Sequence, residues 1–389
     1  MLAMAQTFTV WLSLACFGLA AAGCLYALGA AAVVRRFVGS GSSTPSVSPG
    51  VSVLKPLHGA ASGLHDDLAS FCAQDYRGPV QILLGVQNPA DPAIGVAQHL
   101  MEAWPGRDIE IVLQASSAGP NPKISNVLGL EPRMRHDVVV LSDADIAVER
   151  DYMSKIIATL HLPDVGAVTC LYRGVAQGGV WARLASMGID YHFLPNVLVG
   201  LRLGLARPCF GSTIVLRRET LAAIGGFGAF VDCIADDYAI GEAVRALGMK
   251  VAIPSLVLAH ACAERSAAEL LRHELRWART VRAVNPFGHA GSIVTYPLAF
   301  ALLGASLTSF GLVGMTMIAA AISCRLVLQV QVDHTLQVSS KRWWLGPTRD
   351  LLAFAIHVQS FFVDVVSWRG QRYKVRADGT LMVLGSPKT

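Results

Sequence analysis

The chain has 389 residues, of which 53% are hydrophobic and only 15% are charged. Soluble proteins carry roughly 25% charged residues, so this composition excludes a fully soluble protein and predicts segments that lie in lipid. The net charge is +5, and the basic residues are not interleaved with aromatic ones. That pattern favours attraction to a membrane surface over binding to nucleic acid.

The eight cysteines indicate a reducing compartment. Three of them lie in the two long apolar segments, and the other five are far apart and form no Cys-x-x-Cys pair. Cysteine zinc sites are commonly marked by Cys-x-x-Cys pairs, and disulfide frameworks belong to oxidising compartments. The cysteine pattern therefore argues against both.

The first apolar segment predicts a transmembrane anchor at residues 1–36. No charged residue occurs in residues 7–34, and a helix of that length exceeds the ~30 Å hydrocarbon core of a bilayer. A cleavable signal peptide is the alternative, because Ala21-Ala22-Gly23-Cys24 is similar to a lipoprotein cleavage site. However, Arg35 and Arg36 follow the segment and no Lys or Arg precedes it. The positive-inside rule then predicts an uncleaved anchor and a cytoplasmic central domain.

The second apolar segment predicts a transmembrane helical hairpin over residues 290–332. Its only charged residue is Arg325, and its length suits two helices joined by a tight turn near Gly304–Gly314. We expect the chain to return to the cytoplasm at Lys341 and Arg342, because positive charge favours that side.

The last segment, residues 333–389, is expected to contain an amphipathic, interfacial or membrane helix at 345–366 and a basic cytoplasmic tail. Asp350, His357 and Asp364 are spaced seven apart and would share one face of that helix. Such a polar stripe fits a catalytic or transport path within the membrane. It also fits an interfacial helix whose polar side faces headgroups or the catalytic domain, and the basic tail favours this second interpretation.

Between the apolar segments, residues 50–289 predict a cytoplasmic α/β catalytic domain. Short apolar strands alternate with helices, which is typical of a mainly parallel sheet covered on both faces. The expected strands are 51–56, 81–86, 109–113 and 137–142, and helices are expected at 66–74 and 93–103. In such sheets ligands bind beyond the carboxyl ends of the strands.

Acidic residues occur at these strand ends. Asp91 lies just past the second strand, and Asp143 and Asp145 follow the fourth on one short turn. Two carboxylates at this spacing can hold a divalent ion, and Mg²⁺ or Mn²⁺ prefers such oxygen ligands together with substrate phosphates. An Asp-x-Asp pair alone is often only a solvated turn, but its place after an apolar strand favours a metal and nucleotide site.

Asp236 and Asp237 form a third acidic site, at the start of a helix predicted over 239–247. Acidic residues there are stabilised by the helix dipole, so capping is one interpretation. One Asp would suffice for capping. The second is therefore available as a general base that takes the proton from an attacking hydroxyl.

A fourth element is a helix expected over 271–279. Its spacing places His273 and Trp277 next to each other. Three arginines share one side of the helix: Arg272, Arg276 and Arg279. Arginines can clamp a pyrophosphate, and an indole can form the floor of a sugar or lipid site. The alternative is an amphipathic surface helix that leads into the membrane.

In this order the motifs resemble the D, D, D, (Q/R)xxRW signature of processive and lipid-directed family 2-like glycosyltransferases. The matching residues are Asp91, Asp143, Asp237 and Arg276-Trp277. Over about residues 51–376 the chain most resembles the ceramide glucosyltransferase family, glycosyltransferase family 21. Further local matches are Lys55-Pro56-Leu57, Val86-Gln87, Asp91-Pro92-Ala93-Ile94, Asn121-Pro122-Lys123-Ile124 and Ser367-Trp368-Arg369-Gly370-Gln371-Arg372-Tyr373.

Within that family, residues 190–197, 206–213 and 273–277 look like the bacterial hopanoid-biosynthesis branch. That branch is understood to transfer N-acetylglucosamine from its UDP sugar to bacteriohopanetetrol. The resemblance implies a multi-pass protein of the bacterial cytoplasmic (inner) membrane. A ceramide glucosyltransferase that uses UDP-glucose is the alternative. A membrane transporter is a distant one, and a non-catalytic sugar-binding module is disfavoured because the base Asp237 is present.

The resemblance further implies a GT-A fold, Rossmann-like with a mainly parallel sheet, and an inverting single displacement. The donor-binding residues would be Asp91 at the uridine, Lys123, Asp143, Asp145 and Arg276. Mg²⁺ or Mn²⁺ would be held by Asp143 and Asp145. The base would be Asp237, supported by Asp236. The acceptor would contact Trp277, His192 and His273, although His273 departs from the signature, which usually has Gln or Arg there.

Overall fold

The structure is a computed structural model that describes residues 2–37, 47–114, 117–338, 343–376 and 379–385. The chain divides into two compact units. Unit 1 comprises Met1–Gly39, Leu184–Arg207 and Ser266–Asp364. Unit 2 comprises Ser40–Arg183, Pro208–Arg265 and Val365–Thr389.

Within its described residues, unit 2 is built on a seven-stranded sheet in the order β3-β2-β1-β4-β8-β6-β9. The strands are β1 (Val51–Pro56), β2 (Val80–Val86), β3 (Asp108–Leu113), β4 (Val138–Leu141), β6 (Val165–Thr169), β8 (Ile214–Arg217) and β9 (Lys250–Ala252). Strand β8 runs antiparallel to β4 and β6, and the other neighbours are parallel. The four strands expected from their apolar runs are therefore confirmed, as is the mainly parallel sheet.

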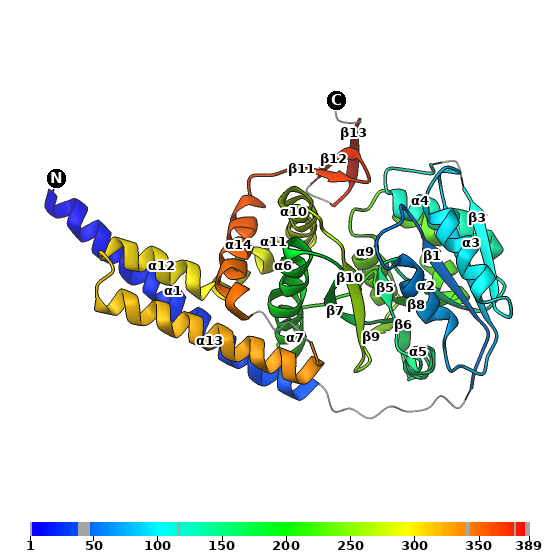
Figure 1. Ribbon diagram of the computed structural model, residues 1–389, viewed down its shortest axis with the longest axis horizontal. Helices are drawn as coiled ribbons and strands as arrows, with labels where there is room; N and C mark the ends of the chain where they lie inside the picture. The colour runs from blue at the N-terminus through cyan, green and yellow to red at the C-terminus, as the bar shows by residue number, and fades with distance from the viewer. Residues whose placement is uncertain (1, 38–46, 115–116, 339–342, 377–378, 386–389) are drawn as a thin grey trace. The chain divides into compact units, whose positions relative to one another are not determined.

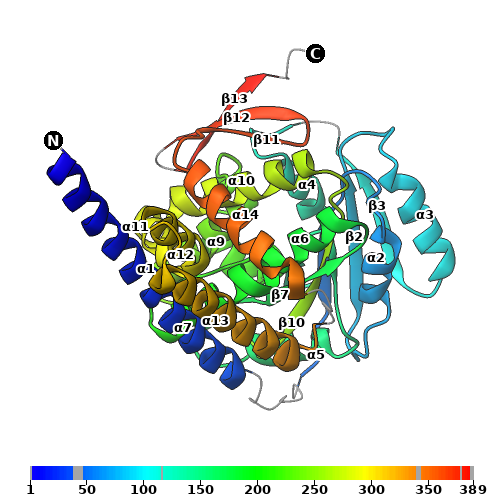
Figure 2. The same ribbon diagram turned by 60° about the vertical axis from the view of Figure 1, so that its left-hand side comes forward.

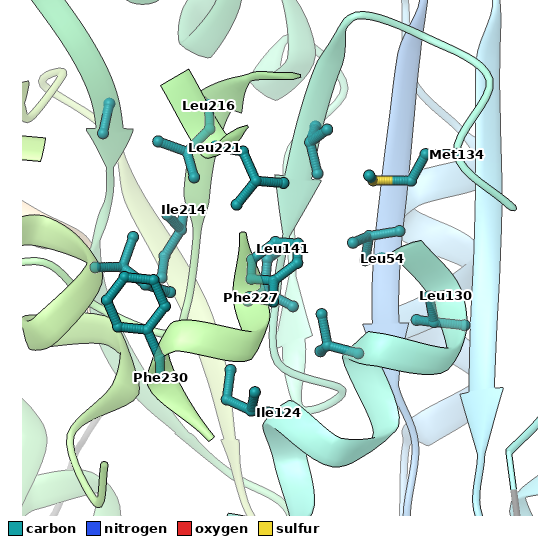
Figure 3. Packing of buried hydrophobic residues seen from close by; sticks show 14 of the residues in the cluster. Leu54, Ile124, Leu130, Met134, Leu141, Ile214, Leu216, Leu221, Phe227 and Phe230 are labelled. Carbon is teal, nitrogen blue, oxygen red and sulfur yellow. The ribbon is translucent and has the colours of Figure 1, made fainter. Parts of the chain in front are cut away.

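Helices cover both faces of this sheet. They are α2 (Leu64–Cys72), α3 (Ala93–Ala103), α4 (Pro122–Leu130), η1 (Glu131–Arg133), α5 (Tyr152–Leu160), α8 (Arg218–Ala223), η3 (Phe227–Phe230) and α9 (Asp236–Ala246). On one face, Leu54 and Leu141 of the sheet pack against Ile124 of α4 and Phe227 of η3 (Figure 3). Side chains alternate along a strand, so Lys55, next to Leu54, points to the opposite face.

A second sheet lies next to the acidic turn of unit 2. It consists of β5 (Ile146–Ala147), β10 (Val257–Cys262) and β7 (Leu171–Ala176), in that order. Strand β5 directly follows Asp145 and pairs with β10. The main-chain N–H of Ala261 also donates to the carbonyl of Asp145 at 2.8 Å. The second sheet thus fixes the far end of the turn that begins at the end of β4.

The end of the chain forms a small antiparallel sheet that we did not expect from the sequence. It contains β11 (Val365–Trp368), β12 (Gln371–Val375) and β13 (Leu381–Gly385) (Figure 2). Its attachment to unit 2 is through main-chain bonds: the N–H of Leu381 donates to Asp232, and the N–H of Ile234 donates to Gly379.

Unit 1 contains the long apolar helices. Helices α1 (Leu2–Phe37), α12 (Pro297–Leu307) and α13 (Leu312–Leu336) lie side by side (Figure 1). A Cβ added at Gly23 of α1 would come within 2.6 Å of the carbonyl of Val294. Small residues at this position let helix backbones approach closely, as in lipid-embedded bundles. The turn between α12 and α13 falls inside the expected 304–314.

In the described part of the chain, α1 and α13 are each long and apolar enough to cross a membrane. A third candidate is a bent pair, in which α11 (Pro286–Gly291) with η4 (Ser292–Thr295) meets α12 at 62°. The protein is therefore membrane-associated, with two or three candidate spans. The expected return point at Lys341 and Arg342 lies outside the described residues.

The other helices of unit 1 are α6 (Val180–Gly188), whose first residues belong to unit 2, η2 (Ile189–Phe193), α7 (Leu194–Arg202), α10 (Ala267–Val284), η5 (Trp343–Leu345) and α14 (Gly346–Gln359). Helix α14 corrects one expectation. It ends at Gln359, so Asp364 does not share its face with Asp350 and His357. The amide N–H groups of Phe361 and Phe362 bond to carbonyls only three residues back, which tightens the last turn and ends the helix.

Candidate active site

The turn that carries Asp143 and Asp145 rests on a buried lysine. The Nζ of Lys55 donates to the Asp143 carbonyl at 2.8 Å and to the Ser142 hydroxyl at 3.0 Å, and it lies 3.6 Å from the centre of the Phe71 ring. Lys55 is fully buried, and this burial lowers its pKa to about 7 despite the nearby carboxylates. Lys55 therefore binds the backbone of the turn that carries the two carboxylates.

Lys123 joins the two acidic segments. Its Nζ lies 2.8 Å from Oδ1 of Asp143 and 3.2 Å from Oδ2 of Asp236. Burial alone would lower the pKa of Lys123, but the carboxylates outweigh it and raise the pKa. The side chain stays charged, and it holds residues from α4, the β4 turn and α9 together.

Asn121 positions Lys123. Its side-chain oxygen accepts hydrogen bonds from the N–H groups of Lys123 and Ile124, so it caps the start of α4. Its side-chain nitrogen donates to the Cys233 carbonyl at 2.8 Å and to Asp236 at 3.1 Å. One buried amide thus fixes both the lysine and the start of the segment that carries Asp236 and Asp237.

Gly211 connects the turn of Asp143 with Asp237. Its N–H donates to Oδ2 of Asp237 at 2.9 Å, and its carbonyl accepts from the N–H of Asp143 at 3.0 Å. A Cβ at this position would come within 2.6 Å of Asp143 Oδ2 and 2.7 Å of Lys123 Nζ. Only glycine lets the backbone pass this close to both side chains.

Asp237 has the electrostatics of a base. The groups around it displace water, and together with the charge of Asp236 they raise its pKa to about 6, whereas Lys123 and the N–H groups of Tyr238 and Gly211 lower it. Asp237 keeps part of its surface exposed. Ala235 is the capping residue of α9 and makes no side-chain bond, whereas Asp237, in the first turn, accepts a hydrogen bond from the N–H of Tyr238 at 2.8 Å. The capping position is therefore filled by neither Asp236 nor Asp237.

Asp143 and Asp145 fit a divalent ion that is shared with a substrate phosphate. Both are partly exposed, and Oδ1 of Asp145 is buried without a hydrogen-bond partner. Among the described residues, no group of three His, Cys, Asp or Glu side chains is placed to hold a metal. Mg²⁺ and related ions need only one or two carboxylates when phosphates complete the shell. The two-carboxylate set therefore suits an ion bound together with a nucleotide.

Asp91 lies in the loop between β2 and α3, just past the strand as expected. Its carboxylate accepts hydrogen bonds from the N–H groups of Gly59 and Ala93 at 2.9 Å, and it lies 3.4 Å from Nδ1 of His58. Asp91 therefore shapes the loop after β1 as well as the start of α3. It belongs to the same unit as Asp143, Asp145, Lys123, Asp236 and Asp237.

Arg276, Trp277 and His273 belong to unit 1, on α10. The rings of His273 and Trp277 meet edge to face with centroids 4.5 Å apart, which confirms their predicted adjacency. The helix is also tied to α14, since Arg349 donates two hydrogen bonds of 2.7 Å to Glu274. This bidentate pair fixes the turn of α10 that carries Arg276 and Trp277.

His192, also in unit 1, lies in the π-helical turn η2. Its Nε2 is 2.9 Å from Oδ1 of Asp350 and 3.0 Å from Nη2 of Arg325, and its ring stacks on Tyr296. Burial and the nearby Arg325 lower the pKa of His192 to about 4, so its imidazole is neutral. His192 is mostly buried in a polar network of unit 1.

Two important residues, Lys55 and Gly211, received no role from the sequence. A signal existed for Lys55, because a lysine inside an otherwise apolar strand needs a buried partner. Gly211 gave no such signal, since a loop glycine is common. Its importance depends on three segments that come together only in the folded chain.

The chain is similar to known glycosyltransferases. The model of glycosyl transferase family 21 matches residues 15–381. Ceramide glucosyltransferase 1 of Caenorhabditis elegans is 23% identical over 86% of this chain and 73% of its own length. An N-acetylglucosaminyltransferase of Azorhizobium caulinodans is 23% identical over 75% of this chain and 74% of its own length.

The fold is shared with a mannosyltransferase of Pyrobaculum calidifontis, solved with GDP-Man and Mn²⁺. The two structures superpose with a TM-score of 0.50 at 19% identity, covering 92% of this chain and 99% of the other. The expected GT-A fold is therefore confirmed. Because the family model spans nearly the whole chain, this protein belongs to glycosyltransferase family 21.

Proposed function

We propose that this glycosyltransferase transfers a sugar from a UDP-sugar to a hydroxyl group of a membrane lipid, with inversion at the anomeric carbon. The observation that carries the proposal is the link through Gly211, whose N–H donates to the carboxylate of the proposed base Asp237 and whose carbonyl accepts from the N–H of Asp143. A base and a diphosphate site held by one residue suit an in-line displacement.

In this mechanism Asp237 takes the proton from the acceptor hydroxyl as the oxygen attacks the anomeric carbon. The new carbon–oxygen bond forms while the bond to the donor diphosphate breaks, and the diphosphate departs with the electron pair. A pKa of about 6 leaves Asp237 ionised at neutral pH and still basic enough to accept a proton. Asp236 supports it through its pairing with Lys123.

The donor is assigned to the residues at the carboxyl ends of the strands. Asp91 would bind the uridine, and Lys123, Asp143 and Asp145 the diphosphate. Mg²⁺ or Mn²⁺ bound by Asp143 and Asp145 would supply positive charge against the leaving diphosphate. The four carboxylates of this cluster outnumber the lysines Lys55 and Lys123, so the cluster attracts a cation.

Arg276, Trp277, His273 and His192 are proposed from the family resemblance alone. Arg276 would steady the departing UDP, because a guanidinium can bind a phosphate with two hydrogen bonds. Trp277, His273 and His192 would contact the acceptor. The apolar helices α1 and α13 favour a lipid acceptor taken from the membrane, and Arg35 and Arg36 at the end of α1 favour a unit 2 that faces the cytoplasm.

For the finer specificity we propose N-acetylglucosamine transfer from UDP-GlcNAc to bacteriohopanetetrol in a bacterial cytoplasmic membrane. The support is the motif resemblance of residues 190–197 and 206–213, together with the N-acetylglucosaminyltransferase among the relatives. The second candidate is glucose transfer from UDP-glucose to ceramide, which the ceramide glucosyltransferase relatives favour.

The test uses the full-length protein in lipid nanodiscs with each of the two donors and each of the two acceptors, and mass spectrometry of the lipid products. N-acetylhexosaminyl bacteriohopanetetrol as the product supports the first candidate, and hexosylceramide as the product replaces it with the second. An Asp237→Asn protein should make neither product. If the wild-type protein binds UDP but forms no glycolipid with any pair of donor and acceptor, the proposal of a lipid acceptor is contradicted.

A further inference from the structure

The hairpin between β11 and β12 has an unusual turn. Its two central residues are Arg369, with φ of 47°, and Gly370, with φ of 77°. Two-residue hairpin turns of this kind require positive φ at both positions and are normally formed by Asn-Gly or Gly-Gly. An arginine in the left-handed region is disfavoured, and such residues cluster at ligand sites, where another function retains them.

The side chain of Arg369 reaches the start of α4 in unit 2. Its Nη1 donates to the carbonyl of Pro122 at 3.3 Å. Pro122 begins α4 between Asn121 and Lys123, the two residues that organise the acidic cluster. This bond places the guanidinium of Arg369 at the first turn of α4.

Arg369 is also close to the loop after β1. Burial lowers the pKa of His58, and the positive charge of Arg369 lowers it further, opposed by the carboxylate of Asp91. The Nδ1 of His58 lies 3.4 Å from that carboxylate. Arg369 thus contacts the residue before Lys123, and its charge acts on His58, which is next to Asp91. Asp91 and Lys123 are the two residues assigned to opposite ends of the nucleotide.

The hairpin is firmly attached at this place. Val366 and Tyr373 are 5% and 2% exposed. Strand β12 pairs with β13, whose first residue donates to Asp232 at 2.8 Å, and Ile234 donates to Gly379 at 3.1 Å. The segment from Asp232 to Ile234 leads directly into Asp236 and Asp237. The C-terminal sheet is therefore anchored beside the acidic cluster and holds Arg369 in a fixed position.

We propose that Arg369 binds the diphosphate of the nucleotide donor, and that the C-terminal sheet serves as the scaffold that presents it. The inference rests on the proposed function, because it takes a nucleoside diphosphate as the ligand of unit 2. A guanidinium matches phosphate oxygens with two parallel hydrogen bonds. It would add positive charge to a phosphate site that otherwise contains more carboxylates than lysines.

The turn allows a test that separates binding from folding. Arg369→Gly and Arg369→Asn place residues that the turn prefers, so the melting temperature should stay the same or rise. If Arg369 binds the diphosphate, the same variants should weaken UDP binding at least about tenfold, the equivalent of ~1.4 kcal/mol. The affinity for uridine, which lacks phosphate, should change little. Arg369→Lys should fall between wild type and Arg369→Gly.

The measurement is calorimetric titration of UDP and of uridine into the full-length protein in nanodiscs with Mn²⁺, alongside melting temperatures. Arg372→Gln is the matched control, because Arg372 is an exposed arginine on the same hairpin. Unchanged UDP affinity in Arg369→Gly, with the melting temperature retained, would overturn the inference and leave the proposed function intact. Wild type that binds no UDP would overturn both. Equal losses for UDP and uridine would also overturn it, since the diphosphate would then not be the target.

Discussion

In the acidic cluster of unit 2, four carboxylates face two lysines, whereas in unit 1 two buried arginines are each paired with one carboxylate. The first set comprises Asp143, Asp145, Asp236 and Asp237 with Lys55 and Lys123. The second comprises Arg325 with Asp350 and Arg349 with Glu274. Both sets are polar and lie largely inside the protein, but only the first carries an excess of negative charge.

This difference in charge balance distinguishes a ligand-binding site from a network that only holds the fold together. A charge without an opposite partner is costly away from water, so an excess is retained where a ligand compensates it. Paired charges need no ligand, and they hold helices in register at little net gain in stability. We therefore expect changes in the acidic cluster to impair catalysis, and changes in the paired network of unit 1 to impair folding.

The largest effect on catalysis is expected for Asp237→Asn. Asparagine cannot accept the proton from the acceptor hydroxyl, so kcat should fall about 100- to 10,000-fold. UDP binding should stay close to that of wild type, because Lys123 still pairs with Asp143. Single-turnover rates and UDP titration measure the two quantities. Asp232→Asn, on an exposed residue of the same segment, is the control, and normal turnover by Asp237→Asn would remove it from the base role.

In the paired network, Asp350→Ala should mainly reduce stability. Arg325 donates two hydrogen bonds to Asp350, at 2.9 and 2.8 Å, and would be left buried without its carboxylate. Removing one partner of such a pair costs about 3–5 kcal/mol, whereas replacing both partners with apolar residues is often neutral. Thermal unfolding in detergent should show a large loss for Asp350→Ala and recovery in Asp350→Leu combined with Arg325→Leu. A stable but inactive Asp350→Ala protein would instead assign this network to catalysis.

The sequence was sufficient for the parts of unit 2 that depend on local patterns. The apolar runs of β1 to β4 predicted the sheet, and their order predicted where Asp91, Asp143 and Asp145 would lie. The i, i+4 spacing predicted the contact of His273 with Trp277. These features depend on residues that are near one another in the chain, so periodicity and position reveal them.

The rest depends on contacts between distant segments. Lys123 meets carboxylates from two other segments, and Gly211 lies between two acidic sites, which no local pattern encodes. The C-terminal sheet was missed for a different reason. Strands β11 and β12 mix polar and apolar residues, and the turn of Arg369 and Gly370 lacks the Asn-Gly signal of a hairpin.

A smaller effect is expected for Gly211→Ala, which tests whether the acidic cluster needs its geometry as well as its charge. The new methyl group would displace the Asp143 carboxylate and the Lys123 ammonium, both under 3 Å away. A misplacement of about 1 Å can cost about 100-fold in rate, and we expect a loss of up to that size with little change in melting temperature. Gly95→Ala is the control, since a Cβ on that helical glycine meets nothing within 4 Å. Equal activity of the two variants would show that the cluster tolerates the shift.

The smallest effect concerns pH. Asp237 must be ionised to act as a base, and burial together with Asp236 raises its pKa to about 6. The kcat/KM of the wild type should therefore be constant above that pH and fall about tenfold per unit below it, since this parameter reports the free enzyme. Asp236→Asn removes one of the two causes that raise the pKa, while Lys123 and the N–H groups of Tyr238 and Gly211 still lower it. The acid limb should then move to lower pH. If the acid limb of Asp236→Asn stays at the wild-type pH, either burial alone raises the pKa of Asp237 or another group titrates there.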